Sequence, residues 1–213
     1  MCNMNLITIL VTRSKSCHVK TLHTILRVNM KCVQTNSKNE IMYVDDNPYQ
    51  KAEIIQECLK RCERVLFIDF GIGMDQGSID QVFEKHEGLP CLVFPGVTDG
   101  VDWGLFRSKV QQDIPEPVEQ MGLQFDTEVG KKISDDIYNV VTTDARVWIM
   151  NSKHILKSIK DKKTGNAKIY PKMFEKFKEQ GVKIYAFTAS KLTMTYTHEC
   201  ISNILNAAGV KAN

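Results

Sequence analysis

The chain has 213 residues, 43% hydrophobic and 25% charged, which is the composition of an ordinary globular protein. Lys and Arg number 28 against 25 Asp and Glu, a net charge of +3 that is too balanced to indicate nucleic acid as a partner. No apolar run approaches the ~18 residues of a membrane span, and the run at 6–11 is too short for a signal-peptide core.

The seven cysteines are scattered and odd in number. Cys58 and Cys62 lie one helical turn apart, but no second Cys or His pair completes a zinc site. We therefore expect reduced thiols in a cytoplasmic protein.

The first half of the chain alternates apolar runs with amphipathic segments. Runs rich in branched residues predict buried strands at 6–11, 40–44, 65–68 and 91–94. Helices are expected at about 17–30, at 49–62 and from Ser78 onward. The apolar face of the first helix is expected to hold Val19, Leu22, Ile25, Leu26 and Val28. This alternation predicts an α/β fold whose mostly parallel central sheet is flanked by helices.

The second half of the chain is less regular. Residues 113–127 contain two prolines and several acids, so we expect a loop over the sheet. Further strands are predicted at 146–150 and 182–187. Further helices are predicted at 154–159, 171–180 and 199–208, the second of them ending before Gly181. No repeat or low-complexity linker divides the sequence, which favours one domain over residues 1–213.

Polar side chains follow four of the predicted strands. They are Thr12-Arg13, Asp45-Asp46, Asp69 and Thr98-Asp99. In open α/β sheets, ligands bind outside the carboxyl ends of the strands. A carboxylate at such a position also serves as a helix cap in many proteins, but four polar strand ends on one edge indicate a site about the size of a nucleotide.

Several nucleotide-binding motifs are missing. No Gly-x-Gly-x-x-Gly follows the first strand, and no phosphate loop ending in Gly-Lys-Ser/Thr is present. Residues 69–71 spell the Asp-Phe-Gly triplet of protein kinases, but no His-Arg-Asp loop or upstream glycine loop accompanies it. A dinucleotide enzyme, a P-loop hydrolase and a kinase are therefore disfavoured.

The layout of the first three strands resembles the GT-A class of nucleotide-sugar glycosyltransferases. In that class a hydrophobic strand leads into an Asp-x-Asp motif, and here residues 65–68 lead into Asp69. The second aspartate of the motif is replaced by Gly71, which leaves that metal ligand without a counterpart. The resemblance implies a GT-A-like single domain that transfers a sugar from a nucleotide donor.

Two further stretches, 68–72 and 94–103, resemble glycosyltransferase domains encoded by large algal DNA viruses, such as the N-terminal domains of chlorella-virus enzymes that build capsid-protein glycans. This resemblance implies a UDP-sugar donor, a glycan acceptor, Mn2+ (or Mg2+) dependence and a retaining outcome. It also implies a viral protein of the host cytoplasm in which this chain is the N-terminal module of a longer polypeptide.

A divalent cation would neutralise the charge that develops on a departing diphosphate, and it prefers oxygen ligands. Asp69 is the first candidate ligand, with Asp75 as a substitute for the missing aspartate. The resemblance adds His198, because several retaining GT-A families use a late histidine; a lone His is more often structural.

The nucleotide itself would meet the ends of the first two strands. Thr12 and Arg13 would contact the base or the diphosphate, and Asp45 or Asp46 would accept a hydrogen bond from the uracil N–H. For the two aspartates, a simple turn before Pro48 is the alternative, and Asp69 is an alternative partner for the ribose.

The sugar and the acceptor have separate candidates. Asp99 and Trp103 would hold sugar hydroxyls and a ring face, unless their segment is only a surface loop with a packed Trp. Asp102 and Asp144 are the candidate catalytic acids.

Two other functions remain open from the sequence. A nucleotidyltransferase of related fold would carry a glycine-rich loop after the first strand, and residues 11–14 contain no glycine. A non-catalytic α/β interaction module is favoured if Gly71 means that the metal site is lost.

Overall fold

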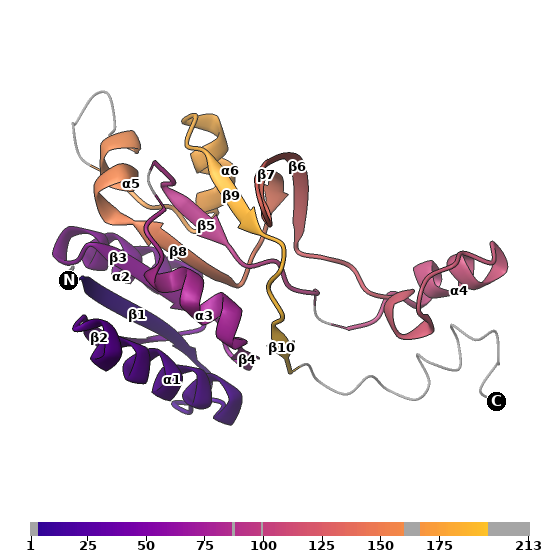
Figure 1. The fold of residues 1–213 in the computed structure, drawn as a ribbon, viewed down its shortest axis with the longest axis horizontal. Coiled ribbons are helices and arrows are strands. Elements are labelled where there is room, and N and C mark those ends of the chain that lie inside the picture. Colours follow the sequence, from indigo (N-terminus) through magenta and orange to yellow (C-terminus); the bar gives the residue numbers. More distant parts are fainter. Residues whose placement is uncertain (1–3, 87, 99, 160–166, 196–213) are drawn as a thin grey trace.

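The computed structural model describes residues 4–86, 88–98, 100–159 and 167–195. An eight-stranded sheet lies between two layers of helices (Figure 1). Its strands are β1 (Asn5–Thr12), β2 (Lys38–Asp45), β3 (Arg64–Ile68), β5 (Cys91–Val93), β6 (Thr127–Ser134), β7 (Ile137–Thr143), β8 (Val147–Asn151) and β9 (Ile184–Phe187). The short strands β4 (Ile72–Gly73) and β10 (Thr193–Met194) form a separate ribbon. The helices are α1 (Val19–Thr35), α2 (Pro48–Arg61), α3 (Gln76–Phe83), α4 (Trp103–Gln111), α5 (Ser152–Ser158) and α6 (Met173–Glu179), with a 3-10 turn η1 (Val118–Gln120).

The strand order is β2-β1-β3-β8-β5-β9-β7-β6. β1 pairs in parallel with both β2 and β3, and β5 pairs in parallel with β9. β8 lies antiparallel between β3 and β5, and β7 lies antiparallel between β9 and β6. The predicted α/β sheet flanked by helices is confirmed, with the difference that an antiparallel strand occupies its middle. A buried strand has the same apolar pattern in either direction, so the sequence did not reveal this reversal.

Each face of the sheet has its own apolar core. One core packs α2, α5 and α6 against strand residues such as Ile9, Val65 and Trp148. The other packs α1 and α3 against residues such as Leu10 and Leu66. Because successive side chains of a strand point to opposite faces, the continuous apolar runs supply both cores at once.

The buried face of α1 differs from the expected one. Ile25 and Val28 are buried, but Val19, Leu22 and Leu26 are 76%, 48% and 54% exposed. The core face is completed by threonines whose hydroxyls make hydrogen bonds inside it. Thr21 Oγ1 donates to the Ile72 carbonyl at 3.1 Å, and Met74 N donates to Thr24 Oγ1 at 3.0 Å. The hydroxyls satisfy the backbone around β4, which an apolar face could not do.

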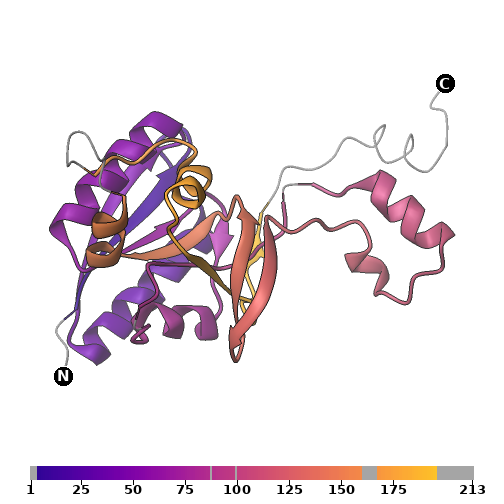
Figure 2. The same ribbon diagram turned by 90° about the horizontal axis from the view of Figure 1, so that it is seen from above.

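Residues 97–98 and 100–125 form an arm that projects away from the sheet, as both views show (Figures 1 and 2). The base of the arm, called its stem, consists of an outgoing and a returning segment that are linked by backbone contacts. Val97 forms a β-bridge with Phe125, and Asp102 N donates to the Gly122 carbonyl at 2.9 Å. The arm carries α4, in which no residue is buried. The expectation of a loop at 113–127 is confirmed as far as residue 126, apart from η1, but its position over the sheet is wrong, because the segment forms the returning half of the arm and β6 begins at Thr127.

The β6–β7 hairpin was not expected from the sequence. Apart from Thr127, β6 is exposed along its length, so it lacks the apolar run of a buried strand.

The predicted helix at 199–208 lies outside the described residues. Within the described part of the chain, no helix is long and apolar enough to cross a membrane.

Candidate functional site

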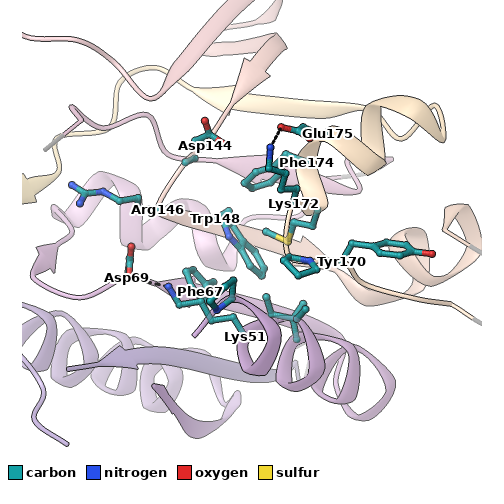
Figure 3. A pocket seen from close by; sticks show the side chains of 16 residues that line it. Lys51, Phe67, Asp69, Asp144, Arg146, Trp148, Tyr170, Lys172, Phe174 and Glu175 are labelled. Carbon is teal, nitrogen blue, oxygen red and sulfur yellow. Dashed lines mark hydrogen bonds and ion pairs between the residues drawn. The ribbon is translucent and has the colours of Figure 1, made fainter. Parts of the chain in front are cut away.

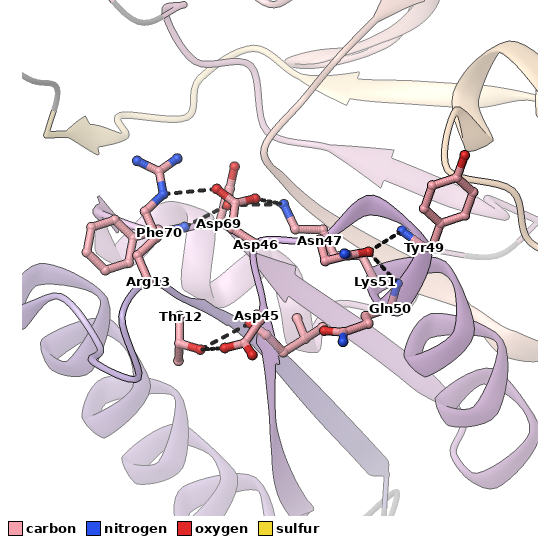
Figure 4. Close-up of polar contacts among 11 residues, drawn as sticks. Thr12, Arg13, Asp45, Asp46, Asn47, Tyr49, Gln50, Lys51, Asp69 and Phe70 are labelled. Carbon is pink, nitrogen blue, oxygen red and sulfur yellow. Dashed lines mark hydrogen bonds and ion pairs between the residues drawn. The ribbon is translucent and has the colours of Figure 1, made fainter.

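Parallel pairing brings the ends of β1, β2 and β3 to one edge of the sheet (Figure 4). Thr12 lies opposite Asp45 in the register, and Asp69 follows β3 directly. Thr12 Oγ1 donates to the Val44 carbonyl and to Asp45 Oδ1, both at 3.2 Å, which fixes the rotamer of the aspartate beside the strand end. The structure therefore assembles the residues that the sequence proposed for the nucleotide.

A lysine that the sequence did not single out joins this edge. Lys51 Nζ lies 2.5 Å from Asp46 Oδ1 and 3.8 Å from Asp69 Oδ1. On its other side Asp46 receives a hydrogen bond from Arg13 Nε at 2.9 Å, and the Arg13 guanidinium lies 5.1 Å from the centre of the Phe70 ring. Burial raises the pKa of Asp46, but the hydrogen bonds and charges of Lys51 and Arg13 outweigh it, so the pKa is lowered overall.

The start of α2 explains how Lys51 reaches the edge. Asn47 caps the helix by accepting from Tyr49 N and Gln50 N, and Pro48 occupies the first turn. Lys51, the fourth residue of this helix, is therefore fixed at the end of the first turn, close to the strand ends. A basic residue in the first turn after an Asp-Asp strand end was the available signal, but in sequence it looks like any solvent-facing lysine.

Asp69 is partly buried, with its side chain 14% exposed. Its Oδ1 accepts a hydrogen bond from Phe70 N at 2.8 Å, and its own N–H donates to the Arg146 carbonyl at 3.0 Å. Gly71 follows with φ of +78°, and a Cβ at this position would lie 3.3 Å from the Thr195 carbonyl oxygen. The backbone therefore favours glycine where the GT-A motif has its second aspartate.

A cavity of about 240 Å³ opens beside Asp69 on the α2 face of the sheet (Figure 3). Its floor is aromatic, because Phe67 and Trp148 stack with ring centres 4.9 Å apart and planes nearly parallel. Polar and charged lining residues include Lys51, Asp69, Asp144, Arg146, Lys172 and Glu175. An apolar floor with a few charged side chains is the usual make-up of a small-molecule site.

A second hollow, of about 260 Å³, lies on the other side of the first turns of α2. It is lined by Thr12, Tyr43, Asp45, Gln50 and Glu53, among others. The two hollows are lined by opposite faces of the same helix. Lys51 of the first hollow is paired with Asp46, which directly follows Asp45 of the second hollow (Figure 4). We treat the two hollows together as one candidate site, called the elongated site, along this edge of the sheet.

Asp126 was missed from the sequence. Its Oδ1 accepts from Gly96 N at 3.1 Å and from Thr127 Oγ1 at 2.8 Å, while its carbonyl accepts from Asp144 N at 2.8 Å. Its buried Oδ2 accepts no hydrogen bond from the described residues. Burial raises the pKa of this carboxyl, more than its hydrogen bonds and the nearby Arg146 lower it. The residue directly precedes β6, so missing that strand also hid its aspartate.

The remaining candidates have other surroundings. Asp75 caps α3, accepting from Gly77 N and from the backbone and hydroxyl of Ser78, and it also accepts from Lys191 N at 3.1 Å. Asp102 caps α4 on the arm, where it accepts from Leu105 N at 2.8 Å. Trp103 begins the same helix and packs edge-on against Phe106. The candidates Asp99 and His198 lie outside the described residues.

A divalent ion in this class of site needs several oxygen or nitrogen ligands that lie close together. Across the described ranges, no group of three or more His, Cys, Asp or Glu side chains could hold a metal ion. Asp69 faces an ammonium, the backbone at position 71 favours glycine, and Asp75 is a fully engaged helix cap. The described residues therefore do not fit the divalent site that the Asp-x-Asp resemblance implies.

No protein-family model and no curated protein matches the sequence. Among solved structures, the chain is similar to a crystal structure of GalNAc-T7 with UDP, GalNAc and Mn2+, with a TM-score of 0.50 and 8% identity. The match covers 92% of this chain and 45% of that one, so the chain spans about half the length of its neighbour. The likeness supports the expected GT-A-like fold, while the resemblance to algal-virus domains stays a prediction.

Proposed function

We propose that this chain is a glycosyltransferase that takes its sugar from a nucleotide donor. The observation that carries the proposal is the elongated site: two hollows on either side of α2, joined by charged side chains at the carboxyl ends of three parallel strands. Support also comes from the fold, which is similar to that of a structure holding UDP and GalNAc.

The hollow beside Thr12 would hold the base. Asp45 offers an exposed carboxylate there, and a carboxylate oxygen accepts the N3–H of uracil, whereas cytosine has no hydrogen at that atom. This chemistry favours a UDP-sugar. The diphosphate would then lie near Arg13 and Lys51, between the hollows.

The cavity beside Asp69 would hold the transferred sugar. Its stacked Phe67–Trp148 floor supplies an apolar surface, and the carboxylates of Asp69 and Asp144 accept hydrogen bonds from sugar hydroxyls. Asp144 is exposed at the mouth, where a glycan acceptor would approach.

We further propose a retaining outcome, in which the leaving diphosphate itself takes the proton of the acceptor hydroxyl as the glycosidic bond forms. Such a step proceeds through an oxocarbenium-like species and needs no general base on the protein. The expected role in viral capsid-glycan synthesis, in the host cytoplasm, rests on the sequence resemblance alone.

Calorimetric titration with UDP, GDP and CMP tests the proposal. We expect UDP to bind most tightly and Asp45→Ala to weaken it about tenfold or more, because a charged hydrogen bond is lost. Asp135→Ala, at a fully exposed aspartate of the β6–β7 turn, is the matched control and should leave the affinity unchanged. A protein that binds none of the three nucleotides would not be a nucleotide-sugar transferase.

A further inference from the structure

The centre of the elongated site already contains a cation. Lys51 Nζ lies between Asp46 Oδ1 at 2.5 Å and Asp69 Oδ1 at 3.8 Å, on carboxylates that come from two different strand ends. Its side chain is only 20% exposed, so it belongs to the wall of the site. An ammonium in this position pairs with Asp69, the first candidate metal ligand, and with Asp46 of the neighbouring strand end.

The local backbone reinforces this arrangement. At position 71 a positive φ of 78° and the nearby Thr195 carbonyl strain any residue other than glycine. At position 75 the carboxylate is engaged by the start of α3 and by Lys191 N. Among the described residues, Lys51 therefore places an ammonium at this point, and no group of three or more His, Cys, Asp or Glu side chains could hold a metal ion.

We propose that Lys51 is a phosphate-binding residue that, together with Arg13, carries the positive charge facing the donor's diphosphate, so that nucleotide binding requires no divalent cation. This inference rests on the proposed function. It departs from the Mn2+ or Mg2+ dependence that the sequence resemblance implies.

The geometry leaves Lys51 able to act on a ligand. An ammonium has three N–H donors, and among the described residues only Asp46 accepts a hydrogen bond from it, while Asp69 at 3.8 Å is an ion pair alone. A phosphate oxygen could therefore accept from Lys51 without breaking its link to Asp46. Asp46 is itself shared with Arg13, whose Nε is 2.9 Å away, so the two cations are held on either side of one carboxylate.

The test is titration of the protein with UDP, once in EDTA and once in Mn2+, for the wild type and three variants. Lys51→Gln removes the charge, Lys51→Arg keeps it, and Lys60→Gln removes an exposed lysine from the last turn of the same helix. Thermal unfolding followed by circular dichroism checks that each variant is folded.

We expect the wild-type affinity for UDP to agree within about threefold between EDTA and Mn2+. Lys51→Gln should lose about tenfold or more in both buffers, Lys51→Arg should lose less, and Lys60→Gln should match the wild type. UDP binding that appears only with Mn2+ would overturn the inference and leave the proposed function standing, and this comparison needs no variant. Undiminished binding by Lys51→Gln would also overturn it. Failure of UDP, GDP and CMP to bind in either buffer would instead overturn the proposed function.

Discussion

The unit from β1 to β3 and the arm at 97–125 belong to one chain but are built differently. In the first, every helix and strand buries a face in one of the two cores, and Ile9 and Leu66 are fully buried. In the arm, α4 buries no residue, and the stem is held mainly by backbone hydrogen bonds. The first unit holds the candidate nucleotide residues, while the arm holds Asp102 and Trp103.

This difference separates stability from adaptability. A segment with few buried contacts opens at low free-energy cost, and the core that it leaves behind does not depend on it. Exposed segments of this kind adapt to their surroundings, whereas the strand ends of the core hold charged side chains in fixed positions. Three substitution experiments test whether the stability of the core is independent of the contacts within the arm.

The largest expected contrast compares Ile9→Ala in β1 with Phe106→Ala in α4. Ile9 is fully buried between strands and helices, so its truncation should cost about 2–5 kcal/mol of unfolding free energy. Phe106 contacts mainly Trp103, with ring centres 5.7 Å apart, and should cost less than about 1 kcal/mol. Urea denaturation measures both. Equal losses would show that the arm belongs to the cooperative core, and Ile9→Val, expected to cost about 0.5–1.5 kcal/mol, keeps the comparison measurable if Ile9→Ala does not fold.

The same contrast explains what the sequence predicted. The runs at 6–11 and 65–68 were found because buried strands are continuously apolar, and their ends then located Thr12 and Asp69. The arm and β6 were missed because exposed elements have no such pattern. Burial therefore decides which elements a single sequence reveals.

Individual side chains in the site were harder to predict than the strands. Lys51 has the sequence signature of an ordinary solvated helix residue, and only the capped start of α2 turns it toward Asp46. On α1, the buried threonines were overlooked because their role depends on the backbone of β4, about 50 residues away. Hydrogen bonds between residues so far apart in the chain produce no periodic pattern in the sequence.

A smaller contrast is expected between two helix caps. Asp75→Ala should lower the free energy of unfolding by about 0.5–2 kcal/mol, because α3 loses its N-cap and the tie to Lys191 N. Asp102→Ala removes an equivalent cap from α4, but it should change global stability by less than about 0.5 kcal/mol while speeding amide exchange in α4. Urea denaturation and hydrogen exchange distinguish the two effects. A large global loss in Asp102→Ala would contradict the independence of the arm.

Acid pH provides an internal check on the Asp75 cap. Burial raises the pKa of Asp75, but its hydrogen bonds from Ser78, Lys191 N and Gly77 N lower it overall. The resulting stability is present above the pKa of an unfolded aspartate and is lost as the pH falls through the lower folded value. The stability difference between wild type and Asp75→Ala should therefore shrink on acidification.

The smallest effect is expected at Asp126, where the arm returns to the sheet, and it has the opposite pH dependence. Burial raises the pKa of Asp126 in the folded protein, so its favourable contribution is present below the unfolded pKa and is lost as the pH rises through the folded value. Asp126→Asn keeps an acceptor for Gly96 N and Thr127 Oγ1 and carries no charge. It should be about 0.5–1 kcal/mol more stable than wild type at pH 8, and this difference should vanish toward pH 4. Urea denaturation across this pH range measures it, with Asp135→Asn as an exposed control. A loss of stability that is the same at every pH would contradict this prediction, because it would mean that the pKa of Asp126 is the same in the folded and the unfolded protein.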